Sequence, residues 1–296
     1  MFSSSLPERP PLNCGGRFLD LTHPVVMAVV NTTPDSFSDG GTLYTNNELD
    51  LDLALKRASD MVVGGAAIVD IGGESTRPGA QPITLQQELD RVLPLLERIV
   101  SELDVIVSVD TSSADVMEAA AHAGAGLIND VRSLTRKGAL DAAARSGLPV
   151  CLMHMQGNPD TMQAAPQYED VVGEVGAYLD QRVLACEQVG IGVDRILLDP
   201  GFGFGKTVKH NLQLLQGLPE FAQRGYPIVV GLSRKSMIAH IIGREVGDRL
   251  PASLALAVLA AQRGANIIRT HDIAETADAL AMLAALTAVE DSREES

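Results

Sequence analysis

One unit recurs eight times along this chain and limits the folds open to it. In each unit a short run of branched apolar residues ends in a group of polar residues, and helical patterns lie between successive runs. The runs occupy residues 25–30, 66–71, 105–109, 126–131, 148–155, 196–198, 227–236 and 265–272. Strands that alternate with helices pair in parallel through right-handed crossovers. Eight such units in 296 residues predict an α/β fold of the (β/α)8 TIM-barrel type.

An open, doubly wound sheet is the main alternative to the barrel. The barrel is favoured because polar residues follow every run, whereas an open sheet concentrates its site at one switch point. No linker or change of composition divides the chain, so we predict a single domain. Residues 17–290 are expected to form the barrel, residues 1–16 a flexible N-terminal tail, and residues 291–296 a disordered C-terminal tail.

The overall composition indicates a soluble protein and disfavours nucleic acid and membranes as partners. A hydrophobic content of 46% is sufficient for a large core, and the longest apolar run, residues 254–261, is too short to span a membrane. The formal net charge of −15 disfavours nucleic acid and anionic lipid as partners. The apolar run at 254–261 fits either a subunit contact or further packing within one chain.

The three cysteines, Cys14, Cys151 and Cys186, are too few and too scattered for a disulfide framework or a thiolate metal site. Cys151 and Cys186 fall in apolar patterns, which indicates packing in the core. This use of cysteine predicts a reducing, cytoplasmic location.

The stretch 196–207 (ILLDPGFGFGKT) is the most distinctive strand end. Asp199 ends an apolar run, and three alternate glycines follow it, which allow main-chain N–H groups to approach a ligand closely. The spacing matches neither a phosphate-binding P-loop nor a dinucleotide-binding loop. The stretch therefore predicts a ligand-binding loop without naming the ligand.

The strand ends of a barrel converge on one mouth, so polar residues far apart in sequence become neighbours. The polar residues expected there are Asn31, Thr76, Arg77, Asp110, Asn129, Asp199, Lys235, Arg269 and His271. Carboxylates and an amide among them can accept N–H donors from a nitrogen-rich heterocycle, and the cations suit phosphate or pyrophosphate.

Each of these residues also has a structural explanation: a helix cap, a turn or a solvated surface charge. Nine of them at one mouth favour a binding function. His154 stays open between a site residue and a hydrogen-bonded core histidine. Because His and carboxylates do not cluster at ligand spacing, any metal is expected to be Mg²⁺, held by water, substrate phosphate and Asn31.

At these motifs the chain resembles the dihydropteroate synthase family. The matching segments are 31–41 (NTTPDSFSDGG), 73–79 (GESTRPG), 108–111 (SVDT), 128–131 (INDV), 153–157 (MHMQG), 199–207 (DPGFGFGKT), 231–236 (GLSRKS) and 269–272 (RTHD). They span almost the whole chain in the expected order. Thr32 and Thr270 depart from the family pattern at positions where substrate contact is not expected.

The resemblance implies a transferase of folate biosynthesis that condenses hydroxymethyl-dihydropterin pyrophosphate with para-aminobenzoate, uses Mg²⁺, is inhibited by sulfonamides and forms a homodimer. It implies that Asp110, Asn129, Asp199 and Lys235 hold the pterin, and that Asn31, Arg269 and His271 hold pyrophosphate and its metal. Asp110, Asp199, Lys235 and Arg269 are the implied catalytic residues. The implied aminobenzoate pocket consists of Phe37, Thr76, Arg77, Pro78, Phe204 and Ser233.

Three other functions remain open at this point. Lys235 could form a Schiff base in an aldolase, with Arg234 and Arg269 lowering its pKa. A pterin-dependent methyltransferase domain shares the barrel and the pterin pocket but has little use for the loops at 31–41 and 73–79. A non-catalytic pterin-binding paralogue would keep the pocket and lose the chemistry.

Overall fold

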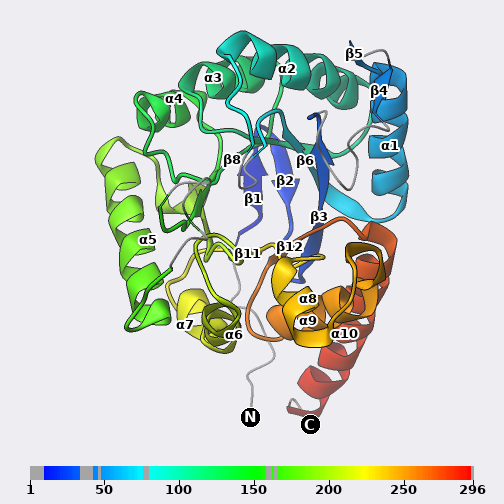
Figure 1. Cartoon of the computed structure of the whole chain (residues 1–296), viewed down its shortest axis with the longest axis vertical. Helices are drawn as coiled ribbons and strands as arrows, with labels where there is room; N and C mark the ends of the chain where they lie inside the picture. Colours follow the sequence, from blue (N-terminus) through cyan, green and yellow to red (C-terminus); the bar gives the residue numbers. More distant parts are fainter. Residues whose placement is uncertain are drawn as a thin grey trace.

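The computed structural model describes residues 10–33, 43–45, 48–75, 80–157, 162 and 166–294. Its centre is a barrel of eight parallel strands surrounded by helices (Figure 1). The strands are β3 (Val25–Asn31), β6 (Ala66–Gly72), β7 (Ile106–Asp110), β8 (Leu127–Asp130), β9 (Val150–Met153), β10 (Ile196–Asp199), β11 (Val229–Val230) and β12 (Ile267–Thr270). All eight predicted strands are present, which confirms the predicted barrel.

The strands follow one another around the barrel in chain order. The hydrogen-bonded order is β10-β9-β8-β7-β6-β3-β12-β11, and every pair in it is parallel. A parallel bridge between Leu198 and Ile228 joins the two ends of this order and closes the ring. Closure brings the carboxyl ends of all eight strands to one rim.

The helices cover the outside of the ring. They are α1 (Leu51–Val63), α2 (Leu85–Glu102), α3 (Ala114–His122), α4 (Ala139–Ser146), α5 (Val171–Gln188), α6 (Val208–Gln216), α7 (Leu218–Ala222), α8 (Ser236–Ile242), α9 (Leu250–Ala261) and α10 (Ile273–Glu294), with short 3-10 turns at η1 (Val193–Arg195) and η2 (Val246–Asp248). None of these helices is long and apolar enough to cross a membrane.

Helix boundaries follow ordinary capping chemistry. A capping box starts α2: the Thr84 side chain accepts from the Gln87 N–H, and the Gln87 side chain accepts from the Thr84 N–H. Helix α1 starts at Leu51 with Asp50 as its N-cap and ends at Val63 with Gly64 as its C-cap. Just before it, β5 (Glu48–Leu49) pairs with β4 (Tyr44–Thr45).

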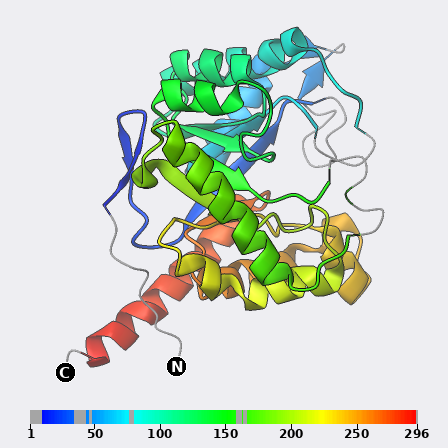
Figure 2. The ribbon, with the colours of Figure 1, turned by 90° about the vertical axis from the view of Figure 1, so that its left-hand side faces the viewer.

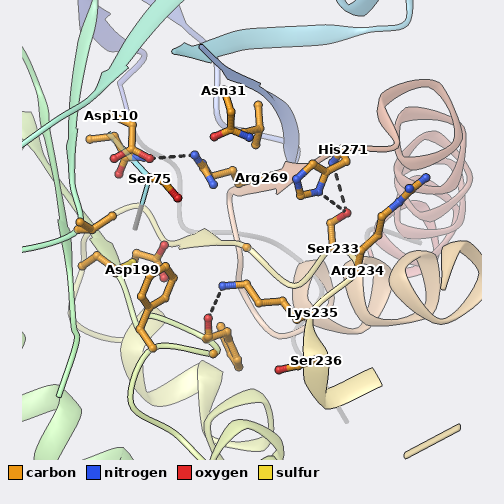
Figure 3. A pocket seen from close by; sticks show the side chains of 18 of the residues that line it. Asn31, Ser75, Asp110, Asp199, Ser233, Arg234, Lys235, Ser236, Arg269 and His271 are labelled. Carbon is orange, nitrogen blue, oxygen red and sulfur yellow. Dashed lines mark hydrogen bonds and ion pairs between the residues drawn. The ribbon is translucent and has the colours of Figure 1, made fainter. Parts of the chain in front are cut away.

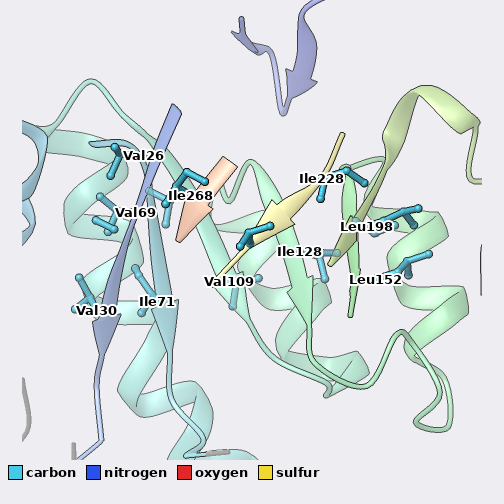
Figure 4. Packing of buried hydrophobic residues seen from close by; sticks show 14 of the residues in the cluster. Val26, Val30, Val69, Ile71, Val109, Ile128, Leu152, Leu198, Ile228 and Ile268 are labelled. Carbon is cyan, nitrogen blue, oxygen red and sulfur yellow. The ribbon is translucent and has the colours of Figure 1, made fainter. Parts of the chain in front are cut away.

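Apolar side chains on the two faces of the barrel strands form two separate layers. Outward-facing residues such as Val69, Ile128 and Leu198 are fully buried against the helices (Figure 4). Inward-facing residues from all eight strands, including Met27, Ile68 and Ile267, fill the amino-terminal half of the barrel interior. Because that half is packed with apolar side chains, the polar strand ends are left to form the opposite, carboxyl end.

A β-hairpin closes the amino-terminal end of the barrel. Its strands, β1 (Leu12–Cys14) and β2 (Arg17–Leu19), pair antiparallel and lie on the left in Figure 2. Leu12, Cys14 and Leu19 are buried in the inner apolar layer. The sequence predicts residues 1–16 as a flexible tail. In the structure residues 12–16 instead belong to this hairpin, so the predicted start of the barrel domain is too late. At the other end of the chain, α10 continues past residue 290, where we expected the barrel to end.

Candidate active site

The polar strand ends meet in a cavity of about 510 Å³ at the carboxyl end of the barrel (Figure 3). Nine residues singled out in the sequence line it: Asn31, Asp110, Asn129, Asp199, Phe204, Ser233, Lys235, Arg269 and His271. The other four predicted site residues, Phe37, Thr76, Arg77 and Pro78, lie outside the described residues.

Strand geometry explains why these side chains share one cavity. Side chains alternate between the faces of a strand, so Asp70 and Gly72 face inward with Ile68 of the inner apolar layer. In the parallel register, Gly72 lies opposite Asp110, and Asp110 lies opposite Asn129. A side chain at Gly72 would meet Asp110, because a Cβ there would lie 3.5 Å from the Asp110 Cβ. The register therefore collects polar groups across three neighbouring strands.

The guanidinium of Arg269 is held between two carboxylates. Its Nε donates to Asp70 Oδ2 at 2.7 Å, and its Nη2 donates to Asp110 Oδ2 at 3.0 Å. Asn129 Nδ2 donates to the same Asp70 oxygen at 3.1 Å. Asp70 is completely buried, and within the described residues its Oδ1 has no hydrogen-bond partner. These contacts fix the plane of the guanidinium beside the Asp110 carboxylate.

Asp70 is a site residue that our sequence analysis missed. It lies inside an apolar run, and we assigned the whole run to a buried strand. The available signal was the residue type itself, since an unpaired carboxylate inside a buried strand is costly and implies a charged partner. The identity of that partner depends on the barrel register and is not encoded locally.

The carboxyl of Asp110 is poised to titrate near neutral pH. Burial raises its pKa to about 7, and the nearby carboxylate of Asp70 adds to this effect, while Arg269 opposes it. Its protonation state therefore changes in the physiological range.

Asp199, at the end of β10, and Lys235, after β11, line the same cavity. Asp199 Oδ1 accepts from the Gly201 N–H at 2.7 Å, and burial raises the pKa of this carboxyl against the lowering effect of that N–H and of nearby cations. Lys235 donates to the Phe202 carbonyl, and its ammonium lies 4.4 Å from the centre of the Phe204 ring. Burial lowers the pKa of Lys235 to about 8, with Asp199 opposing and Arg269 adding to the shift.

His271 is oriented by a hydroxyl. Its Nδ1 lies 3.1 Å from Ser233 Oγ, and its backbone N–H donates to the same oxygen at 3.3 Å. Burial lowers the pKa of His271 to about 4, and the positive charges of Arg269 and Arg234 add to the effect. His271 is therefore neutral at pH 7, so it offers an anion a hydrogen bond and no full positive charge.

Arg234 holds the two loops that carry these residues. Its Nε donates to Asp272 Oδ2 at 3.0 Å, which ties the segment of Ser233 and Lys235 to that of His271. The Arg234 guanidinium, which the aldolase hypothesis placed beside Lys235, is thus paired with Asp272. The positive charge of Arg269 helps to lower the pKa of Lys235.

His154 is buried, and its Nδ1 lies 2.9 Å from the ammonium of Lys206. Of the two explanations left open by the sequence, the structure shows the hydrogen-bonded buried histidine.

Oxygen donors for a metal ion are sparse in the described residues. These residues contain no group of three or more His, Cys, Asp or Glu side chains that could hold a metal. Two oxygens nevertheless flank Gly72: a Cβ there would lie 3.9 Å from Asn31 Oδ1 and 3.8 Å from Asp110 Oδ2. Such a set fits an ion that takes most of its ligands from water and a bound phosphate, as Mg²⁺ does.

Comparison with known proteins identifies the family. Residues 27–271 match the family model described as pterin binding enzyme. The dihydropteroate synthase of Escherichia coli K12 is 52% identical over 281 residues, which cover 95% of this chain and 98% of that protein. That of Haemophilus influenzae is 49% identical over 91% of this chain and 96% of its own length. The chain belongs to the dihydropteroate synthase family.

Solved dihydropteroate synthases have the same fold as this chain. The Yersinia pestis enzyme in a sulfonamide drug complex superimposes with a TM-score of 0.90 at 48% identity, covering 94% of this chain and 99% of that one. The Xanthomonas albilineans enzyme with 4-aminobenzoic acid gives a TM-score of 0.88 at 48% identity, covering 95% and 99%.

Membership in the dihydropteroate synthase family confirms the function predicted from the motifs and makes this chain a transferase. Family membership therefore argues against the two alternative functions for this cavity, the aldolase based on Lys235 and the methyltransferase domain.

Proposed function

We propose that the cavity binds hydroxymethyl-dihydropterin pyrophosphate with its ring at the carboxylates and its pyrophosphate at Arg269, and that para-aminobenzoate enters beside Phe204. This assignment rests on one observation: a single cavity is lined by Asp110, Asn129, Asp199, Lys235 and Arg269. Solved relatives support it, since one contains 4-aminobenzoic acid and another contains 7,8-dihydropteroate.

The pterin ring is assigned to Asp110, Asn129, Asp199 and Lys235. A pterin presents a guanidine-like edge of N–H donors, and the two carboxylates and the Asn129 amide oxygen are acceptors for such an edge. The ammonium of Lys235 supplies a donor for the acceptor atoms of the same ring. Because these side chains are held by buried contacts, little reorganisation is needed when the ring binds.

The pyrophosphate is assigned to Arg269 and His271. Arg269 contributes the positive charge, and neutral His271 contributes one N–H hydrogen bond when its Nδ1 accepts from the Ser233 hydroxyl. The pairing of Arg269 with Asp70 and Asp110 keeps its guanidinium in place before the ligand arrives.

We propose Mg²⁺ as the metal of this site, with Asn31 as its protein ligand and the remaining ligands from water and pyrophosphate. Bound Mg²⁺ supplies charge neutralisation for the departing pyrophosphate. The support from this chain is the pair of oxygens of Asn31 and Asp110 beside Gly72.

The arylamine is assigned to a pocket that includes Phe204 and Ser233, together with the predicted residues Phe37, Thr76, Arg77 and Pro78. The Phe204 ring supplies an apolar face next to the cation of Lys235. An aminobenzoate carries both an aromatic ring and an anionic carboxylate, so this pairing suits it.

The reaction needs no covalent enzyme intermediate. The bond from the pterin methylene carbon to the pyrophosphate oxygen breaks, and pyrophosphate leaves with the electron pair. The amine nitrogen of para-aminobenzoate forms a bond to that carbon and then loses a proton to solvent. Arg269 stabilises the charge that develops on the leaving group, and Asp110 and Asp199 lie close to the electron-poor pterin, where they stabilise its positive charge.

One assay tests this function. Purified protein supplied with the pterin pyrophosphate and Mg²⁺ should release pyrophosphate only when para-aminobenzoate is added, and a sulfonamide should compete with that addition. Release that is independent of para-aminobenzoate, or the absence of release, would contradict the proposal and favour the non-catalytic paralogue.

We also propose that the protein is a cytoplasmic homodimer. Helices α9 and α10 pack against each other and leave Leu259, Met282, Leu286 and Val289 exposed. Exposed apolar side chains on adjacent helices are typical of subunit contacts. The three cysteines are free and buried, which fits a reducing compartment.

A further inference from the structure

The glycine-rich loop between β10 and α6 encloses the ammonium of Lys206, a residue to which the proposed reaction assigns no role. Lys206 is 3% exposed. Its Nζ lies 2.9 Å from the carbonyl oxygens of Gly201 and Phe204 and 2.9 Å from His154 Nδ1. An ammonium has three donors, so these three acceptors use all of them.

The conformation of the loop around the Lys206 ammonium depends on its glycines. Gly201, Gly203 and Gly205 all have positive φ, a region that other residues rarely adopt. A Cβ at Gly201 would lie 1.8 Å from the His154 carbonyl oxygen, so a side chain cannot be accommodated there without a shift of the loop. The carbonyls of Gly201 and Phe204 therefore converge on one site, where the lysine serves as a built-in cation.

The same loop carries groups that face the active-site cavity. The Phe202 carbonyl accepts from Lys235, and the Phe204 ring lies against the Lys235 ammonium. Lys206 thus contacts the backbone of Phe204 from within the loop, while Lys235 contacts its ring from the cavity. A shift of the loop would move Phe204 and the anchor of Lys235 together.

We propose that Lys206 is a positioning residue of the transferase, whose ammonium holds the loop in the conformation that presents Phe204 to the arylamine and the Phe202 carbonyl to Lys235. This inference rests on the proposed function of the cavity. Lys206 acts through these residues and makes no contact with substrate. The loop also anchors Lys235, one of the four residues assigned to the pterin, whereas Asp110 and Asn129 belong to other strands. A shift of the loop should therefore weaken binding of the arylamine, which meets Phe204 directly, more than binding of the pterin.

The protonation state of His154 agrees with the geometry. Burial lowers the pKa of His154 to about 3, and the Lys206 charge adds to the effect, so His154 is a neutral acceptor at Nδ1 at pH 7. Burial lowers the pKa of Lys206 itself to about 7, and the Asp199 carboxylate opposes that shift. Near pH 7 the three acceptors are therefore all matched only by the protonated form, which has three donors.

The test compares Lys206→Met with Lys209→Met, the same change at an exposed position on α6. Lys206→Met removes all three donors and should raise the KM for para-aminobenzoate about tenfold or more, given the strength of hydrogen bonds to a charged group. Its Kd for the pterin pyrophosphate should stay within about threefold of the wild-type value, and Lys209→Met should match the wild type on both. A folded Lys206→Met protein with an unchanged KM, or with equal losses for both substrates, would overturn the assignment.

A second pair of variants covers the case in which Lys206→Met does not fold. His154→Gln keeps an acceptor for the ammonium, whereas His154→Leu removes it, so only His154→Leu should raise the KM for para-aminobenzoate. Equal KM values for the two variants would overturn the assignment. Failure of the wild-type protein to form dihydropteroate would instead refute the proposed function, so the two failures are distinguishable.

Discussion

At the scale of single residues, the carboxylate pair Asp70 and Asp110 sets how the site responds to pH. Both share the guanidinium of Arg269, and the charge of Asp70 helps to raise the pKa of Asp110 to about 7. Asp110 is assigned to accept N–H donors from the pterin, which requires its ionised form. Ligand binding is therefore coupled to the protonation of one buried carboxyl.

We expect pterin affinity to fall with pH below 7, because protonated Asp110 must lose its proton when the ring binds. The Kd should rise by about tenfold for each pH unit below 7 and be constant above it. Asp70→Asn removes the neighbouring negative charge, so the same profile should shift to lower pH. Isothermal titration calorimetry from pH 5.5 to 8.5 measures both profiles, and a flat profile in the wild type would contradict this role for Asp110.

His271 should be neutral in the free protein at pH 7. Its pKa of about 4 lies below the usual value of 6.5, so the folded state binds fewer protons than the unfolded state between these pH values. Its contribution to stability is therefore complete above pH 6.5 and is lost as the pH falls toward 4. NMR titration of the imidazole should give this low pKa, and added pyrophosphate should raise it. A free-protein pKa near 6.5 would contradict the burial argument.

At the scale of elements, strands were predictable where apolar runs were long enough to show a pattern. The eight barrel strands all appear as such runs. The hairpin of β1 and β2 was missed because its strands have three residues each and follow a proline-rich segment. The overlooked signal was Gly15-Gly16 between them, since both adopt the positive φ that a tight two-residue hairpin turn requires.

The site was predictable in outline and not in its contacts. The sequence places Asp110, Asn129 and Asp199 at strand ends, and parallel pairing is enough to bring them together. The pairing of Arg269 with Asp70 depends on barrel closure and register, which no local pattern records. The neutral state of His271 likewise follows from burial by distant segments.

The hairpin should contribute stability without contributing to catalysis, because it packs at the end of the barrel opposite the active site. Leu12→Ala removes a buried side chain from the inner apolar layer and should lower the free energy of unfolding by about 2–5 kcal/mol. Phe18→Ala lies on the same hairpin but is 69% exposed, so it should cost less than about 0.5 kcal/mol. Urea denaturation measures both values. A Leu12→Ala protein as stable as Phe18→Ala would show that the hairpin does not seal the barrel.

At the scale of the whole molecule, the apolar residues exposed on α9 and α10 predict self-association. A charge placed on this surface should separate the subunits, because burying an unpaired carboxylate at an interface is costly. Met282→Glu on α10 should therefore convert the dimer to a monomer, whereas Val63→Glu, at an exposed apolar residue on α1, should leave it intact. Sedimentation analysis of the two variants distinguishes these states. A wild-type monomer, or a Met282→Glu dimer, would contradict the proposed interface.

The central claim is that side chains from separate strands hold opposite ends of one small molecule at one rim of the barrel. Its most direct test is calorimetric titration of Asp199→Ala with the pterin pyrophosphate. The control is Asp194→Ala, at an exposed residue of the 3-10 turn η1 that precedes the same strand. We predict that Asp199→Ala weakens this binding by about a hundredfold or more, since a buried charged acceptor is lost, and that Asp194→Ala binds like the wild type. Unchanged affinity in Asp199→Ala would contradict the account.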